Sequence, residues 1–251
     1  MNVVDFGADK KGKKDSSKAI QKALDYAIDN GSNSVQIKVV VPKGKYRIDK
    51  LLEIYSNTWL YLEDGATIVR NFDKGCMIKN AQANGAGGYG SERNIVIEGG
   101  CWDGNPSSTS RPFSNMRFGH MKNLWIKNVE IKNNYNGHHV EIGGVKGITI
   151  EDCDFHGYTG TFQKEAIQLD TISNSDVFPA YEPFDDTPCD NAVIKNNKFH
   201  DLILHITVGI GCANQGQRHV MRANAGVQPA GQVNACLLYT SPSPRDRTRS
   251  R

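Results

Sequence analysis

Three short segments share an alternation of apolar and polar residues, and their polar positions could do acid/base chemistry. They read Met116-Arg117-Phe118, Val140-Glu141-Ile142 and Ile167-Gln168-Leu169. If their apolar residues point inward, the period-two alternation of a strand turns a polar set outward on one face: Arg117, His139, Glu141, Gln168 and Asp170. Such a face would suit a hydroxyl-rich sugar.

Glycoside hydrolysis needs two carboxyl groups, one to protonate the leaving oxygen and one to activate water or attack the sugar. If the segments are adjacent parallel strands, Glu141 and Asp170 differ by one strand spacing and two residues, or roughly 8 Å between backbone positions. Inverting enzymes hold their carboxyl groups roughly 6.5–9.5 Å apart. The pair therefore fits an inverting hydrolase, although acidic residues on a sheet face are usually only solvated.

Further candidates lie just before these strands. His138 and His139 could act as acid or base near neutral pH, or could stabilise the turn in which they lie. Glu165 adds a third carboxyl group for catalysis. Lys164 joins Arg117 and Gln168 as a candidate substrate-binding residue, and the two basic residues leave open a lyase, which removes a proton beside a carboxylate.

A long insertion, residues 173–190, is rich in proline, aspartate and aromatic residues. Long loops in compact repeats are usually functional or disordered. Tyr181 could stack on a sugar ring, and Asp185 and Asp186 could bind substrate or calcium. The same residue types are also ordinary loop formers.

An internal repeat indicates which elements position these residues. Four related strand phrases begin at Asn94, Asn123, Gly147 and Asn191, so successive starts lie 29, 24 and 44 residues apart. A unit of about 24 residues with insertions is typical of a solenoid. Each unit alternates apolar residues, turns at Asn or Gly, and forms a second short strand. We predict an all-β fold, a right-handed parallel β-helix, in preference to a β-sandwich, which would not need the phrase to return in phase.

The N-terminal segment predicts a cap for this solenoid. Residues 3–8 read as a short strand, and Asp15-Ser16-Ser17 begins a helix with apolar residues at helical spacing that ends at Gly31. Strands follow within residues 35–41, 44–48, 60–62 and 66–69. A helix over the end of the solenoid would cover its unpaired strand edges.

Several phrases resemble a known superfamily. The opening residues 3–24, the Val40-Val-Pro-Lys-Gly-Lys-Tyr46 phrase and Gly100-Cys-Trp-Asp-Gly104 resemble rhamnogalacturonase, epimerase and pectate-lyase-like β-helix proteins, including polygalacturonases. This resemblance covers about residues 2–212 and implies a polysaccharide as the ligand. In polygalacturonases, Asn-Thr-Asp, Asp-Asp and Gly-His-Gly phrases begin successive strands. Here the matching places read Asn136-Gly-His138, Lys164-Glu165 and Val208-Gly209, so only Glu165 keeps an acid.

Composition excludes several other classes. The +3 net charge arises wholly within residues 236–251, which hold four arginines and one aspartate, so no basic face predicts nucleic-acid binding. No apolar run is long enough for a membrane span. The cysteines other than Cys236 have no metal-site spacing, so we expect free thiols and neither zinc nor another bound metal.

The C-terminal residues divide into two segments. Residues 213–235 lack the strand phrase and read as a divergent coil or spliced sequence. Residues 236–251 resemble one reading frame of a sequencing-library adapter, with a natural disordered tail as the alternative. We therefore expect one β-helix domain over residues 1–212 that is incomplete at its C-terminal end.

These observations predict a carbohydrate-active enzyme, a glycosidase in preference to a polysaccharide lyase, acting on a pectin-like or other acidic polysaccharide. No cofactor is expected, except calcium if the chain is a lyase. The rival is a glycan-binding phage tailspike or adhesin, which could be a trimer. No signal peptide is visible, so the cytoplasm, a phage virion, or secretion from a gene with a missing true start all remain open.

Overall fold

A computed structural model describes residues 1–82, 85–162, 164–202, 208–210, 232–233 and 237–239. The helical elements are η1 (Val3–Phe6), α1 (Ser17–Asn30) and η2 (Pro106–Ser108). The first strands are β1 (Lys11–Asp15), β2 (Ile37–Val41), β3 (Gly44–Ile48), β4 (Leu52–Ile54), β5 (Thr58–Leu62), β6 (Ala66–Arg70), β7 (Ile78–Asn80), β8 (Arg93–Glu98) and β9 (Cys101–Asp103). They are followed by β10 (Met116–Lys127), β11 (Glu130–Tyr135), β12 (Val140–Glu151), β13 (Asp154–Thr159), β14 (Ile167–Asp170), β15 (Asp190–Lys195), β16 (Asn197–His200), β17 (Val208–Ile210), β18 (Gln232–Val233) and β19 (Leu237–Tyr239).

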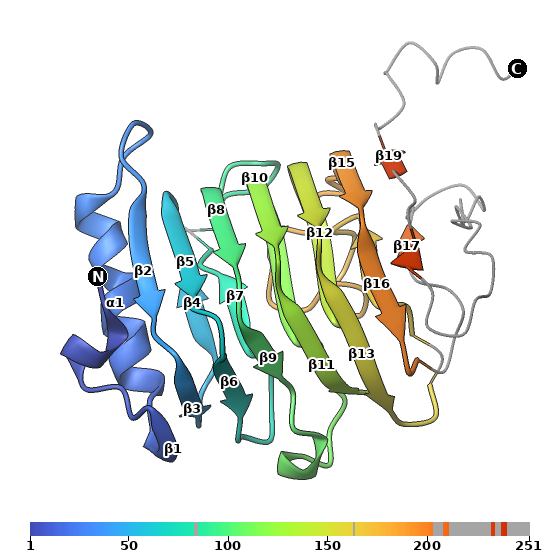
Figure 1. The fold of residues 1–251 in the computed structure, drawn as a ribbon. Helices are drawn as coiled ribbons and strands as arrows, with labels where there is room; N and C mark the ends of the chain where they lie inside the picture. The colour runs from blue at the N-terminus through green and yellow to red at the C-terminus, as the bar shows by residue number, and fades with distance from the viewer. Residues whose placement is uncertain (83–84, 163, 203–207, 211–231, 234–236, 240–251) are drawn as a thin grey trace, which may run out of the picture.

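The strands stack as coils whose equivalent strands pair in parallel, which confirms the predicted right-handed parallel β-helix (Figure 1). One face, the site face, holds β4, β7, the first half of β10, the first half of β12, β14 and β17. A second face holds β2, β5, β8, the later halves of β10 and β12, and β15. The third face runs from β1 through β3, β6, β9, β11 and β13 to β16.

Asparagine marks the corners between these faces because it tolerates a left-handed backbone better than most residues. Asn94, Asn123 and Asn191 have φ values of 55°, 58° and 55°. The Asn123 side-chain amide donates to Asn94 Oδ1 at 2.9 Å, so the corner side chains form a ladder from coil to coil. The repeat phrase seen in the sequence is therefore a corner signal followed by a strand.

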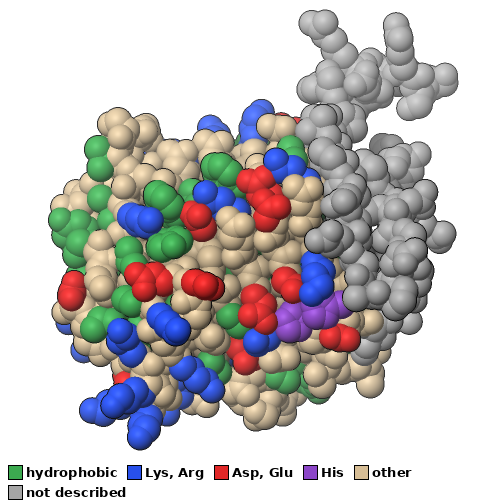
Figure 2. Space-filling view, in the orientation of Figure 1, with side chains coloured by type: hydrophobic (Ala, Val, Ile, Leu, Met, Phe, Trp, Pro, Cys, Tyr) green, Lys and Arg blue, Asp and Glu red, His purple; other side chains and the backbone are tan. Residues whose placement is uncertain are grey.

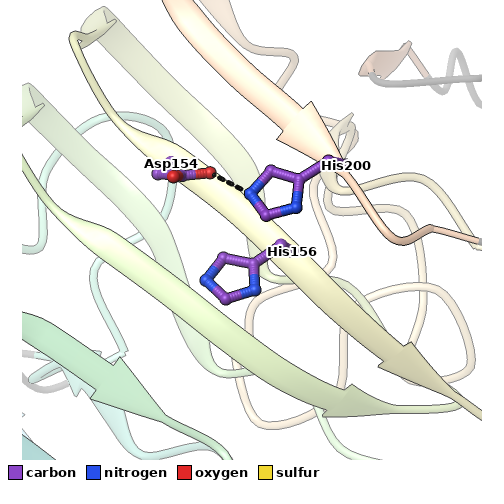
Figure 3. Close-up of side chains that lie close together, drawn as sticks. All are labelled: Asp154, His156 and His200. Atoms are coloured by element: carbon purple, nitrogen blue, oxygen red, sulfur yellow. Dashed lines mark ion pairs between the residues drawn. The ribbon is translucent and has the colours of Figure 1, made fainter. Parts of the chain in front are cut away.

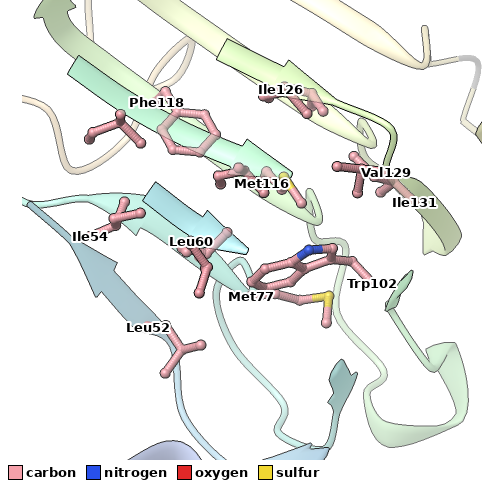
Figure 4. Close-up of a cluster of buried hydrophobic side chains, with 14 of the residues drawn as sticks. Leu52, Ile54, Leu60, Met77, Trp102, Met116, Phe118, Ile126, Val129 and Ile131 are labelled. Carbon is pink, nitrogen blue, oxygen red and sulfur yellow. The ribbon is translucent and has the colours of Figure 1, made fainter. Parts of the chain in front are cut away.

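The core is the stack of inward side chains inside the coils. Ile97, Ile126, Ile150 and Ile194 follow one another at equivalent positions and are almost wholly buried. Figure 4 shows the neighbouring interior layers, in which Trp102 lies among aliphatic side chains from all three faces. Because each layer contacts the next, the register of every coil is fixed by its apolar residues.

Helix α1 lies at the N-terminal end of the stack and contacts β2, β4 and β5 (Figure 1). Its buried residues include Ile20, Ala23 and Leu24, so the predicted capping helix is confirmed. Residues 3–8 do not form the expected strand: Val3–Phe6 form η1, and Asn2 Oδ1 accepts from Val4 N at 3.0 Å to begin its turn.

At the other end, β18 pairs with β16 and β19 pairs with β15, both antiparallel. Most of residues 213–251 lie outside the described part, and the division of this segment stays a prediction. Four cysteines within the described residues are free thiols, and Cys212 lies outside them. No helix in the described part is long and apolar enough to cross a membrane.

Candidate functional site

The three alternating segments are neighbours on the site face in the predicted register. Arg117 pairs with Glu141, and Glu141 pairs with Gln168. In the next coil Val208 pairs with Ile167 and Gly209 with Gln168, so the predicted match of Val208-Gly209 with Lys164-Glu165 is wrong by three residues. Asp170 lies opposite Gly143, two residues beyond Glu141 along the strand direction. The diagonal placement of Glu141 and Asp170 on adjacent strands is thus present.

Glu141 is held in place by hydrogen bonds from two neighbouring side chains. Its Oε2 atom accepts from Arg117 Nη2 at 2.6 Å, from Arg117 Nε at 3.0 Å and from Ser114 Oγ at 2.8 Å. The carboxylate partner raises the pKa of Arg117 although burial opposes this, so the guanidinium keeps its proton. Because the Glu141 side chain is only 7% exposed, it contributes a fixed negative charge beneath the site rather than a freely accessible base.

Asp170 has the most perturbed carboxyl group of the site. Burial, with smaller contributions from the negative charges of Glu141 and Glu165, raises its pKa to about 6 against the hydrogen bond from Gln168 and the charge of Lys164, which lower it. The Gln168 amide donates to Asp170 Oδ1 at 2.9 Å. A carboxyl group that is still partly protonated near pH 6 is suited to general acid catalysis.

Lys164 and Glu165 directly precede β14, the strand that carries Asp170. The charges of both residues act on Asp170, which places them in its electrostatic surroundings. Lys164 is exposed, and the Glu165 side chain is 26% exposed, so both are open to a ligand. Glu165 is therefore more accessible than Glu141.

The two histidines occupy different environments. His138 Nδ1 donates to the backbone carbonyl of Glu165 at 2.8 Å and lies 3.8 Å from Glu165 Oε2. Burial lowers the pKa of His138, partly opposed by the charge of Glu141. His138 thus lies beside Glu165, where it fixes the backbone, and within reach of the charge of Glu141.

His139 does not face outward, contrary to the prediction. It is fully buried, its ring lies edge-on to core residue Phe155, and its Nε2 donates to the backbone carbonyl of His156 at 3.0 Å. Burial lowers its pKa to about 4, so the ring is neutral at physiological pH. The alternation fails here because His139 precedes the strand, directly after the turn at Asn136 with φ 51°. Its side chain is therefore part of the interior and does not line the site face.

The loop after β14 packs onto the site face instead of standing away from it. Phe178, Tyr181 and Ile172 form a second hydrophobic cluster. They lie where the strands present glycine: a Cβ on Gly119 would meet the Tyr181 ring at 2.5 Å, and one on Gly143 would meet Phe178 at 3.0 Å. Because Gly143 is the register partner of Asp170, this apolar cover lies beside Asp170 and accounts for part of its burial.

Tyr181 is buried, which overturns the expectation that it stacks on a sugar. Its hydroxyl lies 3.1 Å from Asn80 Oδ1 and 3.0 Å from the Arg117 carbonyl, so it anchors the loop to two coils. Asp185 is also committed within the molecule: Oδ2 accepts from Gly88 N at 2.7 Å, and Oδ1 accepts from Thr187 N at 3.1 Å. Asp186 is exposed in the same loop. A role for either aspartate in binding calcium or substrate stays a prediction.

Two features of the site escaped sequence analysis. Ser114, which bonds to Glu141 and accepts from the backbone N–H of His138 at 3.3 Å, has no motif that would single it out. The docking of the loop did leave a signal, since Gly119 and Gly143 occupy outward strand positions where a β-helix normally displays a side chain. Glycine there marks a close approach by another segment.

Comparison with known proteins gives the same architecture. The family model described as rhamnogalacturonase A/epimerase, pectate lyase-like matches residues 1–228. The plasmin and fibronectin-binding protein A of Streptococcus pneumoniae is 28% identical over 231 residues, covering 79% of this chain. The match spans 31% of that protein's length, so the chain corresponds to about a third of this relative.

Two solved structures share the fold. The S. pneumoniae surface protein and adhesin PfbA superposes with a TM-score of 0.72 at 23% identity, covering 87% of this chain and 57% of that one. The family 28 exopolygalacturonase of Yersinia enterocolitica gives a TM-score of 0.60 at 17% identity, covering 83% of this chain and 44% of that one. The same fold thus occurs in an adhesin and in an exopolygalacturonase.

Proposed function

Because the chain belongs to the rhamnogalacturonase A/epimerase, pectate lyase-like family, we propose that its site face hydrolyses glycosidic bonds in a pectin-like or other acidic polysaccharide. The observation that carries this proposal is the raised pKa of Asp170 beside two further carboxylates. Environments that push the pKa values of neighbouring carboxyl groups apart are how glycosidases assign an acid and a base.

In the proposed reaction Asp170 is the general acid. Its carboxyl proton passes to the glycosidic oxygen as the bond from that oxygen to the anomeric carbon breaks. Glu165, the more exposed carboxylate, takes a proton from the water that attacks the anomeric carbon. Glu141, fixed by Arg117 and Ser114, adds a nearby negative charge to the burial that raises the pKa of Asp170. His138 is a positioning residue that holds the backbone of Glu165.

Substrate binding in this scheme uses Lys164 and Gln168. The exposed Lys164 can pair with a carboxylate of an acidic sugar, and Gln168 lies on the strand of Asp170, opposite Glu141 on the neighbouring strand. Arg117 is less available because Glu141 already occupies its guanidinium. We therefore assign Arg117 to the support of Glu141 rather than to direct contact with substrate.

Substitutions test these roles. Asp170→Asn and Glu165→Gln should each lower the rate of reducing-end release by about 10²–10⁴-fold, the usual contribution of a general acid or base. Asp64→Asn, which removes an exposed carboxylate from the turn between β5 and β6, is the matched control and should leave the rate unchanged. Equal activity in Asp170→Asn and the control would exclude Asp170 as the acid.

A lyase is the nearest chemical alternative. It needs a neutral base, and the raised pKa of Arg117 makes that residue unsuitable, which leaves Lys164 for the step. Calcium would then be required to neutralise the substrate carboxylate. Unsaturated uronate products, detected by their ultraviolet absorbance and abolished in Lys164→Met, would favour the lyase over the hydrolase.

A non-catalytic adhesin is the second candidate function, favoured by the likeness to the plasmin and fibronectin-binding protein. The second face offers a surface for it, where Lys38 lies 3.9 Å from the ring centroid of Trp59 and 4.0 Å from that of Tyr61. Trp125, on the same face, is 41% exposed. Glycan or host-protein binding that is lost in Trp125→Ala, without product formation, would support this function.

A further inference from the structure

A cluster of two histidines and one aspartate lies on the third face, away from the proposed catalytic groups. Asp154 and His156 belong to β13 and His200 to β16, and the register pairs His156 with His200. Figure 3 shows the two imidazole rings one above the other with Asp154 beside them. In the space-filling view the histidines form a patch bordered by acidic and basic side chains (Figure 2). The three residues are partly exposed, so the cluster is open to solvent.

The rings are held by further carboxylates. Glu130 Oε1 lies 2.9 Å from His156 Nε2, and Asp201 Oδ2 lies 2.9 Å from His200 Nδ1. Metal-ligating histidines almost always have one ring nitrogen bonded to a carboxylate, carbonyl or water, which fixes the ring for coordination through the other. In His200 the nitrogen left over is Nε2, and it points at Asp154.

The contact between Asp154 and His200 is close but is not a hydrogen bond. Asp154 Oδ1 and His200 Nε2 face each other as an ion pair at 2.9 Å, and both atoms are buried without a hydrogen bond among the described residues. Buried polar atoms that make no hydrogen bond are rare and costly. Two such atoms turned toward the same point form an arrangement that a cation bound by both would satisfy.

We propose that Asp154, His156 and His200 bind a divalent transition-metal ion of the zinc class. Imidazole and carboxylate together suit zinc, whereas calcium and magnesium prefer oxygen ligands alone. Ligands at about 2.1 Å from a tetrahedral zinc ion lie roughly 3.4 Å from one another. The ligand atoms of this cluster all lie within 4.8 Å of one another, so small side-chain rotations would close the site.

Two lysines near the cluster influence its affinity for a metal ion. Lys198 Nζ lies 3.2 Å from Asp154 Oδ2, which leaves Oδ1 for the metal but places a positive charge nearby. Lys132 Nζ lies 2.8 Å from Glu130 Oε1. The metal would join β13 to β16 across adjacent coils. Three protein ligands leave a further coordination position open to water or to another ligand.

Titration of the tag-free full chain with Co²⁺, followed by visible absorption, tests the proposal. Co²⁺ takes the place of zinc and gives intense visible bands in a four-coordinate site. We expect these bands to saturate at a single equivalent of Co²⁺ and to disappear on addition of Zn²⁺. Asp154→Asn and His200→Asn should each weaken Co²⁺ binding by at least tenfold, and Glu130→Gln should weaken it by about 10–100-fold through the His156 ring.

Two further variants keep the test decisive. Lys198→Met removes the competing charge and should tighten Co²⁺ binding severalfold, a gain that misfolding cannot mimic. His138→Asn removes a histidine outside the cluster and should leave the Co²⁺ spectrum unchanged. Absent bands in the folded wild-type chain, or the same spectrum in the Asp154→Asn and His200→Asn variants, would overturn the proposal.

Discussion

Replacing Asp170 by asparagine should stabilise the protein at alkaline pH while removing its proposed catalytic acid. The substitution keeps the size of the side chain and its contact with Gln168, but removes a carboxylate whose ionisation the native site disfavours. The pKa of Asp170 is raised from 3.8 to about 6 by burial and by the charges of Glu141 and Glu165. A native group with a raised pKa binds its proton more tightly than the unfolded chain does.

The sign and size of the effect follow from this difference. The favourable contribution of protonated Asp170 is complete below about pH 4 and is lost as pH rises through about 6. Two pH units correspond to about 3 kcal/mol as an upper limit. Because Asp170 is partly exposed, screening by solvent reduces the expected value to about 1–2 kcal/mol. The free energy of unfolding of Asp170→Asn, relative to wild type, should therefore rise by about 1–2 kcal/mol between pH 4 and pH 8.

Urea unfolding followed by tryptophan fluorescence at about pH 4 and pH 8 measures the difference. The exposed control Asp64→Asn should show no pH-dependent change in the free energy of unfolding. If Asp170→Asn destabilises the protein equally at both pH values, Asp170 is an ordinary ionised surface carboxylate. The assignment of Asp170 as the general acid would then lose its physical basis.

Three further predictions concern the surroundings of the site. The pKa of His139 is lowered to about 4 by burial, so its contribution to stability is complete above about pH 6.5 and is lost as pH falls toward 4. His139→Phe should therefore reduce, by up to about 3 kcal/mol, the loss in free energy of unfolding that acidification causes in urea titrations. An unchanged loss would contradict the buried placement of His139. Tyr181→Phe removes the loop's hydroxyl contacts with Asn80 and Arg117 and should cost about 1 kcal/mol, with faster proteolysis of the loop as a second readout. Phe118→Ala, in the core, should lower the free energy of unfolding by about 3–5 kcal/mol. Trp125→Ala, on the exposed second face, should change it by no more than about 0.5 kcal/mol. Similar urea midpoints for the two variants would argue against the core as described.

The repeat in the sequence was sufficient to predict the fold and the register of β10, β12 and β14 on the site face. Apolar residues at alternate positions of β10, β12 and β14 must stack inside the coils, and a shift by one residue would expose all of them. Arg117, Glu141, Gln168 and Asp170 were therefore placed correctly relative to one another. The corner asparagines gave the phase of the repeat because their left-handed conformation recurs once per coil.

Features outside the regular strands could not be predicted in the same way. His139 precedes its strand, so the turn at Asn136 decides its direction and the alternation does not apply. Tyr181 belongs to a loop whose position depends on contacts with Asn80 and Arg117, which are 101 and 64 residues away in the chain. Local sequence holds no record of such contacts except the glycines that make room for them.

The histidine cluster was missed by motif spacing, although the repeat contains the register that assembles it. His156 and His200 are 44 residues apart, so no short metal-binding spacing is visible in the sequence. The repeat nevertheless aligns the strand phrases of their two coils with the same 44-residue offset. Extending that register along β13 and β16 places the two histidines opposite each other on adjacent strands. Spacing rules for local motifs therefore miss sites that a solenoid assembles from successive coils.

Hydrolysis of glycosidic bonds at the site face is tested most directly by the products formed from polysaccharides. The purified protein should be incubated with pectin-type and other acidic polysaccharides. Reducing ends and the absorbance of unsaturated uronates should both be followed over time. We predict new reducing ends without new absorbance, at a rate that falls as pH rises above about 6 because Asp170 loses its proton. Bound polysaccharide with no increase in reducing ends would contradict the proposed hydrolysis and identify the chain as part of an adhesin.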